Sequence, residues 1–300
     1  MSKPCSCTLL WTVVAVLVAN VPRLEAESIP ELEPGRVLAF ASHAPLEKAP
    51  VVSSIALDPS GALLATAGDD HLVRIWDADR GEVLRRLAAH TDWVQSAVFS
   101  PDGGTLAAAG HDRRITLWAL DGRQPPRTLP GETRATTALL FTPDGRILAA
   151  AGFDDKVHLY DGRTGGEIRV LQSPCGGIRT LACSPDGSQL AAAGRNGCIR
   201  VWDMATGESV YHLEHHRRRV RSLAYSPDGT QLASAGDERS VLLWDMATGQ
   251  LGKALPPRPG IVLSMAFCGA GRLAAGGSDN VIRLWDLATS TEQFRLVGHT

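Results

Sequence analysis

Short apolar runs alternate with turn residues along most of the chain. The stretch SPDGTQLASAGDERSVLLWDMATGQ (226–250) shows the unit, in which a Pro-Asp-Gly turn, an apolar run, a polar turn and a second apolar run follow one another. Proline presets φ at the start of such a turn and glycine accepts a positive φ, so the runs are expected to be strands joined by tight turns. Helical periodicity is absent from these units, and the pattern therefore predicts an all-β protein.

The unit repeats with almost constant spacing. The turn signal appears as DPSG, SPDG, TPDG, SPDG, SPDG and CGAG, beginning at residues 58, 100, 142, 184, 226 and 268. An aromatic residue marks a later strand at spacings of 42, 42, 42, 42 and 41 residues, at Trp76, Trp118, Tyr160, Trp202, Trp244 and Trp285. Such regularity indicates a repeat protein, in which each unit buries its faces against its neighbours and is not stable alone.

Each unit is predicted to contain four strands, which in the fifth repeat are 220–226, 231–236, 241–245 and 251–255. The last of these is outermost, and its equivalents elsewhere are 83–87, 168–171, 210–213 and 294–297. The second strands are rich in alanine, as in LAAAG (106–110), although alanine has weak β propensity. We therefore expect the sheets to pack so closely that only small side chains fit between them.

The SPDG…LASAG…LLWD pattern and its five relatives resemble the WD40 family of β-propellers over residues 36–300. The resemblance implies a ring of four-stranded blades around a narrow channel. In this family the first outer strand commonly completes the last blade, and RVLAF (36–40) looks like such a strand, while His299 and Thr300 match residues that open a repeat. We therefore expect a seven-bladed ring whose seventh blade lies beyond Thr300. The alternative is a complete six-bladed ring with residues 36–40 to spare.

The resemblance also implies a structural hydrogen-bond chain in each blade, from a His through a Ser or Thr and an Asp to the Trp. The residues expected to serve this structural role are Asp70, Trp76, His90, Asp112, Trp118, Asp154, Tyr160, Trp202, His216, Ser234, Trp244, Asp279 and Trp285. Asn196 and Glu238 replace the Asp in two repeats, and Ala108 is one of three alanines at the hydroxyl position. We therefore expect the chain to be incomplete in every blade, with the Asp residues orienting turns and not acting as catalysts.

The N-terminal segment differs from the repeats. Thr8–Val21 is an apolar run of 14 residues, shorter than the roughly 20 that a membrane span needs. It predicts a signal peptide over 1–26 with cleavage after Ala26, and the alternatives are an uncleaved anchor or a buried apolar segment. Residues 27–35 form a polar linker. We accordingly expect an exported protein that is periplasmic, extracellular or membrane-anchored facing outward.

Four cysteines would remain after cleavage, namely Cys175, Cys183, Cys198 and Cys268. No C-x-x-C spacing occurs, which disfavours zinc and thioredoxin-like redox sites. Cys183 falls where other repeats place an inward Phe, so we expect it to be a small core residue. Export would permit one disulfide, but the spacing selects no pair.

The sequence offers little support for catalysis. G-x-x-x-x-G-K, G-x-S-x-G and H-E-x-x-H are absent, and the fixed period leaves almost no room for the loop insertions that propeller enzymes usually carry. Asp pairs at 69–70 and 154–155 lie in turns without calcium-loop spacing, and the His215–His216 pair is more simply a loop. We predict no enzyme activity, no cofactor and no metal. The net charge of −2 also argues against nucleic-acid binding.

In the WD40 family, partners often dock on the face where the first strand begins and the turn between the second and third strands lies, named here the top face. By register, its positions in this chain are Trp93, Gln95, His111, Thr137, Phe153, Arg179, Arg195, Arg219, Arg221 and Asp237. We expect Trp93 and Phe153 to be exposed aromatic contacts and the arginines to form one basic sector that recognises carboxylate or phosphate groups. The alternatives are that Trp93 covers a neighbouring blade and that the arginines form a solvated loop.

Three functions follow, in order of preference. The first is a non-catalytic propeller scaffold that binds proteins on its top face, with an acidic protein segment preferred over nucleic acid as the partner. The second is a regulatory or sensor module of a longer multidomain protein. The third is a propeller hydrolase or oxidoreductase. A membrane would be contacted only through an uncleaved N-terminal segment.

Overall fold

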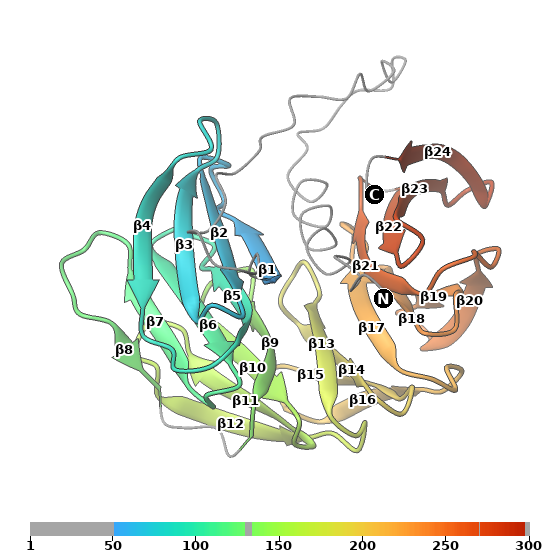
Figure 1. Ribbon diagram of the computed structural model, residues 1–300. Helices are drawn as coiled ribbons and strands as arrows, with labels where there is room; N and C mark the ends of the chain where they lie inside the picture. The colour runs from blue at the N-terminus through green and yellow to red at the C-terminus, as the bar shows by residue number, and fades with distance from the viewer. Residues whose placement is uncertain (1–50, 130–133, 270, 298–300) are drawn as a thin grey trace, which may run out of the picture.

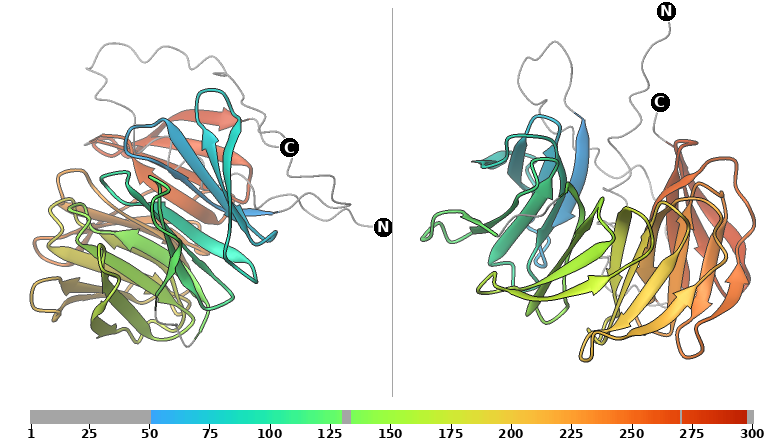
Figure 2. Two further views of the ribbon diagram at one scale, coloured as in Figure 1. Left: turned by 90° about the vertical axis from the view of Figure 1, so that its left-hand side faces the viewer. Right: turned by 90° about the horizontal axis from the view of Figure 1, so that it is seen from below.

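The computed structural model describes residues 51–129, 134–269 and 271–297. These residues form six antiparallel sheets of four strands each and contain no helix. The sheets follow one another around an arc, with their innermost strands facing a common axis (Figures 1 and 2). The predicted all-β class with repeated four-stranded units is therefore confirmed.

Each sheet is one meander of consecutive strands. The first contains β1 (Val52–Leu57), β2 (Leu63–Gly68), β3 (Leu72–Asp77) and β4 (Val83–Ala88). The second contains β5 (Val94–Phe99), β6 (Thr105–Gly110), β7 (Ile115–Ala119) and β8 (Arg127–Thr128). The third contains β9 (Thr136–Phe141), β10 (Ile147–Gly152), β11 (Lys156–Asp161) and β12 (Glu167–Gln172).

The remaining three sheets repeat this order. The fourth contains β13 (Ile178–Cys183), β14 (Gln189–Gly194), β15 (Ile199–Asp203) and β16 (Ser209–Leu213). The fifth contains β17 (Val220–Tyr225), β18 (Gln231–Gly236), β19 (Val241–Asp245) and β20 (Gln250–Ala254). The sixth contains β21 (Val262–Phe267), β22 (Arg272–Gly277), β23 (Val281–Asp286) and β24 (Thr291–Val297).

Figure 1 places β1 and β21 at the two ends of the arc, so the described sheets do not close into a six-bladed ring. The predicted signal or anchor (1–26), linker (27–35) and outer strand (36–40) lie outside the described residues. The seventh blade also lies outside the described residues and stays a prediction.

The single 41-residue spacing has a local origin. In the fifth sheet Tyr225 pairs with Leu232, whereas in the sixth sheet Phe267 pairs with Leu273. The turn between the first two strands of the sixth sheet is therefore one residue shorter, and the strands around it keep their register.

The core lies between neighbouring sheets. Between the third and fourth sheets, Ala149, Ala151 and Ala192 pack with Leu190 and Trp202, and all five side chains are buried. Similar clusters join the other neighbouring pairs. Small side chains on the second strands let large ones from the next sheet approach closely, which explains why a weak strand former such as alanine is used there.

Hydrogen bonds between neighbouring sheets recur at the innermost and at the outermost strands. Near the axis, backbone amides donate to a hydroxyl of the preceding sheet, as Ala97 does to Ser54 at 3.0 Å and Met265 does to Ser222 at 3.0 Å. At the rim, one side chain per outer strand reaches a carbonyl of the next sheet. These donors are Arg85, Arg127, Arg169, Tyr211 and Lys253, each 42 residues from the last.

Within residues 51–129, 134–269 and 271–297, no helix has the length and apolar character needed to cross a membrane.

Candidate functional site

Each innermost strand contains a bulge that determines which side chains face the axis. In the fourth sheet Ile178 pairs with Gly194 and Thr180 pairs with Ala193, so Arg179 is the extra residue. The equivalent extra residues in the other sheets are Ser53, Gln95, Thr137, Arg221 and Leu263. A bulge bends the strand and redirects a side chain. These residues all line one central cavity.

A glycine makes each bulge possible. A Cβ added to Gly236 would lie 2.0 Å from the carbonyl oxygen of Arg219, and one added to Gly110 would lie 2.0 Å from that of Trp93. Any larger residue would push the start of the first strand away from the second. The glycines that end the second strands are therefore required by close backbone approach.

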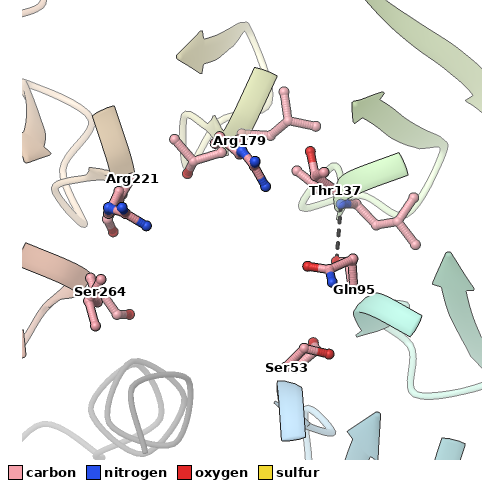
Figure 3. A pocket seen from close by; sticks show the side chains of 14 residues that line it. Ser53, Gln95, Thr137, Arg179, Arg221 and Ser264 are labelled. Carbon is pink, nitrogen blue, oxygen red and sulfur yellow. Dashed lines mark hydrogen bonds between the residues drawn. The ribbon is translucent and has the colours of Figure 1, made fainter. Parts of the chain in front are cut away.

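The cavity has a volume of about 280 Å³, and polar side chains on its wall outnumber the apolar ones, which are Ala138, Leu139, Leu181 and Leu263. Arg179 on β13 and Arg221 on β17 lie next to each other on this wall, with Gln95, Thr137 and Ser53 on the other side (Figure 3). Hydroxyl groups from the neighbouring position add to the wall, and they belong to Ser54, Ser96, Thr180, Ser222 and Ser264. The cavity can therefore hold a polar, hydrogen-bonding ligand.

Arg179 and Arg221 line this cavity, and the charges of Arg195 and Arg219 act on Arg179 from beside it. We name these four residues the arginine cluster. Burial is the main cause that lowers the pKa of Arg179, followed by the charges of Arg219, Arg221 and Arg195. Arg221 forms an ion pair with Asp237, which is the only ion pair of the cluster among the described residues. The Nε of Arg219 is buried without a hydrogen-bond partner. The cluster therefore carries unneutralised positive charge.

Three ring-bearing residues continue this basic surface across the second and third sheets, and we name them the aromatic band: Trp93, His111 and Phe153. The ring centroids of Trp93 and His111 are 5.5 Å apart, and those of His111 and Phe153 are 6.1 Å apart. The guanidinium carbon of Arg179 lies 4.6 Å from the centre of the Phe153 ring, in cation–π geometry. Band and cluster thus form one continuous surface over four neighbouring sheets, the second to the fifth.

Two details of the predicted top face need correction. Trp93 and Phe153 are partly buried and not fully exposed as expected. Gln95, Arg179 and Arg221 line the cavity and not the outer part of the face, because the bulges turn them inward. Of the other predicted positions, Arg195 is exposed and Arg219 is partly buried, and their contact with a partner stays a prediction.

The expectation that the structural hydrogen-bond chain is incomplete in every blade is wrong for the fifth sheet. There Trp244 Nε1 donates to Ser234 Oγ at 2.8 Å, and Ser234 Oγ lies 2.8 Å from His216 Nε2. His216 Nδ1 lies 2.9 Å from a carboxylate oxygen of Glu238. Because a carboxylate only accepts, Nδ1 carries the hydrogen and Ser234 donates to Nε2. The Glu side chain serves in place of Asp.

In the other sheets, the described residues form only parts of this chain. His90 Nδ1 lies 2.9 Å from Asp112, but its Nε2 has no hydrogen-bond partner, because Ala108 offers no hydroxyl to it. Trp118 packs beside His90, with the ring centroids 5.9 Å apart. In the first sheet Trp76 Nε1 donates to Thr66 at 2.8 Å.

The remaining predicted structural residues make other contacts. Asp70 pairs with Arg74 at 2.6 Å and Asp279 pairs with Arg283 at 2.5 Å. Asp154 lies 3.6 Å from His158, whose ring stacks on Tyr160 with centroids 6.3 Å apart. The indole rings of the fourth and sixth sheets, Trp202 and Trp285, are buried.

Sequence reasoning missed Arg258, which stands where other repeats place the His. It is buried and donates to the carbonyl of Ala275 at 3.0 Å. Burial lowers the pKa of Arg258 to about 10, despite the opposing charge of Asp279. Its 42-residue distance from His216 was the available signal.

Cys175 and Cys198 form a disulfide, with their Cα atoms 5.0 Å apart. Cys183 and Cys268 are free thiols, and burial raises the pKa of Cys183 to about 12. The bridge joins the segment that leads to Arg179 with the turn that carries Arg195. It therefore supports two members of the arginine cluster.

No group of three or more His, Cys, Asp or Glu side chains in the described part of the chain is arranged to hold a metal ion.

Comparison with known proteins identifies the repeats. The sequence profile of the family described as "WD40: WD domain, G-beta repeat" matches residues 36–77, 81–119, 123–161, 165–203, 207–245 and 252–286. The protein belongs to the WD40 family. Proteins of this family are propellers that typically bind other proteins and are typically non-catalytic, and the six repeats of this chain fit such an interaction scaffold.

One curated relative is similar over a single repeat length. A segment of 43 residues is 42% identical to a protein of Thermomonospora curvata named "Probable serine/threonine-protein kinase PkwA". The match covers 14% of this chain and 6% of that relative. The chain therefore spans only a small part of the relative's length.

Proposed function

We propose that this WD40 protein is a non-catalytic scaffold that binds a partner protein on its top face, through the aromatic band and the arginine cluster. The observation that carries the proposal is the contact of Arg179 with Phe153, because it joins the two groups into one surface. Aromatic and arginine side chains dominate binding energy at protein interfaces. An acidic segment is the partner that complements the charge of the cluster.

Rigidity supports the same proposal. The contact side chains stand on bulges and short turns that are fixed by sheet packing, so little conformational entropy is lost when a partner binds. Asp237 orients Arg221, and Phe153 supports Arg179. A guanidinium group held in place can form two parallel hydrogen bonds to one carboxylate.

The disulfide supports the proposal that the protein acts outside the cytoplasm. Disulfides persist in oxidising compartments and are rare in the cytosol. A bridge between Cys175 and Cys198 agrees with export through the apolar N-terminal segment. Alkylation of free thiols in freshly isolated protein, with and without prior reduction, tests whether the bridge exists in the cell.

A second candidate function is a regulatory module of a longer protein. The kinase-named relative favours it, since a repeat similar to one of this chain occurs there within a much longer sequence. The mass of the protein in the cells that make it separates the candidates. A mass well above that of 300 residues favours the module, and a mass near that of the chain favours the scaffold.

Affinity capture with matched variants tests the docking face. The immobilised native protein is compared with Trp93→Ala and Arg219→Glu, and Arg86→Glu on the exposed side of β4 serves as the charge control. We expect both face variants to reduce recovery of the same partners by about tenfold or more, and the control to retain them. Unchanged recovery by both face variants, with native circular dichroism, would reject the proposed face.

A further inference from the structure

The wall of the central cavity presents hydrogen-bond donors in excess. Ser96, Thr180 and Ser222 each already accept a backbone amide from the next sheet, at 3.2, 3.3 and 3.0 Å. A hydroxyl that accepts in this way still has its own hydrogen to donate. Because all three line the cavity, their free donors add to those of Arg179 and Arg221. A ligand that only accepts hydrogen bonds matches such a wall.

The positive charge on and beside the wall also favours an anionic ligand. The arginine cluster holds four guanidinium groups, and among the described residues only Asp237 forms an ion pair with any of them. Three positive charges remain. A single carboxylate would neutralise one of them, whereas a phosphate monoester carries about −1.5 to −2 at neutral pH and three strong acceptor oxygens. The cluster is therefore better matched by a doubly charged oxyanion than by one carboxylate.

The guanidinium groups are also held in place before any ligand binds. Phe153 lies under Arg179 at 4.6 Å, and Asp237 pairs with Arg221. The two arginines extend from the innermost strands of neighbouring sheets and both line the central cavity (Figure 3). Planar, fixed guanidinium groups suit bidentate hydrogen bonding to phosphate oxygens, and fixing them in advance lowers the entropy cost of binding.

We propose that the central cavity binds the dianion of a phosphate monoester at its arginine-lined wall, with Arg179 and Arg221 in contact with the phosphate oxygens and Arg195 and Arg219 adding charge at the rim. This inference rests on the proposed docking face and names the group that the face recognises. The cavity volume of about 280 Å³ leaves room for a phosphate and the first atoms of its ester group.

Calorimetric titration tests the site with three probes: inorganic phosphate, a short phosphoserine peptide flanked by glycines, and the same peptide with glutamate in place of phosphoserine. We expect the phosphopeptide to bind at least about tenfold more tightly than the glutamate peptide, since the additional charge-assisted hydrogen bonds are strong ones. Equal affinity for inorganic phosphate and phosphopeptide would identify a free anion or small ester as the source. Preference for the phosphopeptide would identify a modified protein partner.

Matched variants locate the binding. Arg179→Gln and Arg221→Gln should each weaken phosphopeptide binding by about tenfold or more, because each removes charge-assisted hydrogen bonds. Arg217→Gln is the control, since Arg217 is an exposed arginine close to Arg219 in the sequence and does not line the cavity. Its affinity should stay within about twofold of native. Broadening of the phosphorus NMR signal by the native protein gives a readout that does not depend on the folding of any variant.

The inference is overturned if neither phosphate probe binds the native protein, if the glutamate peptide binds as tightly as the phosphopeptide, or if both cavity variants bind like the control. These failures differ from failure of the proposed function. If Trp93→Ala loses partner capture but no phosphate probe binds, the proposed docking face stands and only the phosphate inference is rejected. Unchanged capture in the face variants would remove the face itself.

Discussion

Cys175 and Cys198 connect the same two segments of the fourth sheet that His216 and Glu238 connect in the fifth. In both sheets the link runs from the segment before the first strand to the turn between the second and third strands. One link is a covalent bond and the other is a hydrogen bond. Pro174 stands at the His position of the fourth sheet, so this sheet secures the segment that leads to Arg179 by a different chemistry.

Removing the disulfide is expected to destabilise the protein. The bridge closes a loop with a sequence separation of 23 residues, and loop-closure entropy predicts a contribution of about 3 kcal/mol to the free energy of unfolding. The Cys175→Ser, Cys198→Ser double variant should lose about this amount in urea unfolding followed by tryptophan fluorescence. A reductant should destabilise the native protein equally and leave the double variant unchanged. An equal effect of reductant on both proteins would contradict the assignment.

The hydroxyl of Ser234 should make a large contribution to stability. Ser234→Ala leaves the buried Trp244 Nε1 and His216 Nε2 without partners, which should cost about 3 kcal/mol of unfolding free energy. Ala108→Ser is the reciprocal change, because the new hydroxyl would donate to the unpartnered Nε2 of His90. We expect it to stabilise the protein by about 1 kcal/mol. Denaturant unfolding measures the free energy of unfolding of both variants. A stability loss in Ala108→Ser would show that the position cannot accept a hydroxyl.

The stability of the protein should fall as the pH drops below about 6.5. Burial lowers the pKa of His90 and His216 from the ordinary value of 6.5, and it outweighs the opposing effects of Asp112 and Glu238. The unfolded chain therefore binds protons more readily than the folded chain. This contribution is complete above the unfolded-state pKa and is lost as the pH falls through the lowered folded-state values.

Urea midpoints at pH 7.5 and 5.5 measure this dependence. Carboxylates with lowered pKa values, such as Asp228, lose their contribution only at more acidic pH and do not interfere in this interval. The His90→Gln, His216→Gln double variant should show a smaller difference between the two pH values than the native protein. An equal difference would assign the dependence to other groups.

A side chain at Gly236 should disturb both stability and the arginine cluster. In Gly236→Ala the new Cβ would lie 2.0 Å from the carbonyl oxygen of Arg219, so the bulge that directs Arg221 must shift. We expect a loss of more than about 2 kcal/mol in unfolding free energy. Gly166→Ala is the control, because its new Cβ would approach Thr164 Oγ1 no closer than 3.7 Å. Equal stability of the two variants in thermal unfolding would show that the close approach is not required.

Much of the fold could be predicted because its signals are local. The Pro-Asp-Gly turns, the alternating apolar runs and the recurring aromatic at Trp118 and its equivalents report strand and turn preferences of a few residues each. Even the rim contacts follow the 42-residue period, as the distance from Arg85 to Arg127 shows. The candidate site was predicted only in part. The register identified Arg179 and Arg221, but nothing in the sequence indicated that a bulge turns them into the cavity.

By itself, the sequence determined the repeat, the four strands of each unit and the WD40 family, since these depend on residues close together in the chain. The tertiary structure alone decided which cysteines pair, that Glu238 completes a hydrogen-bond chain, and that Phe153 supports Arg179 across two sheets. Each of these depends on how far one backbone segment lies from another and which way a side chain points. Such distances are set by sheet packing and strand register, which no single repeat encodes.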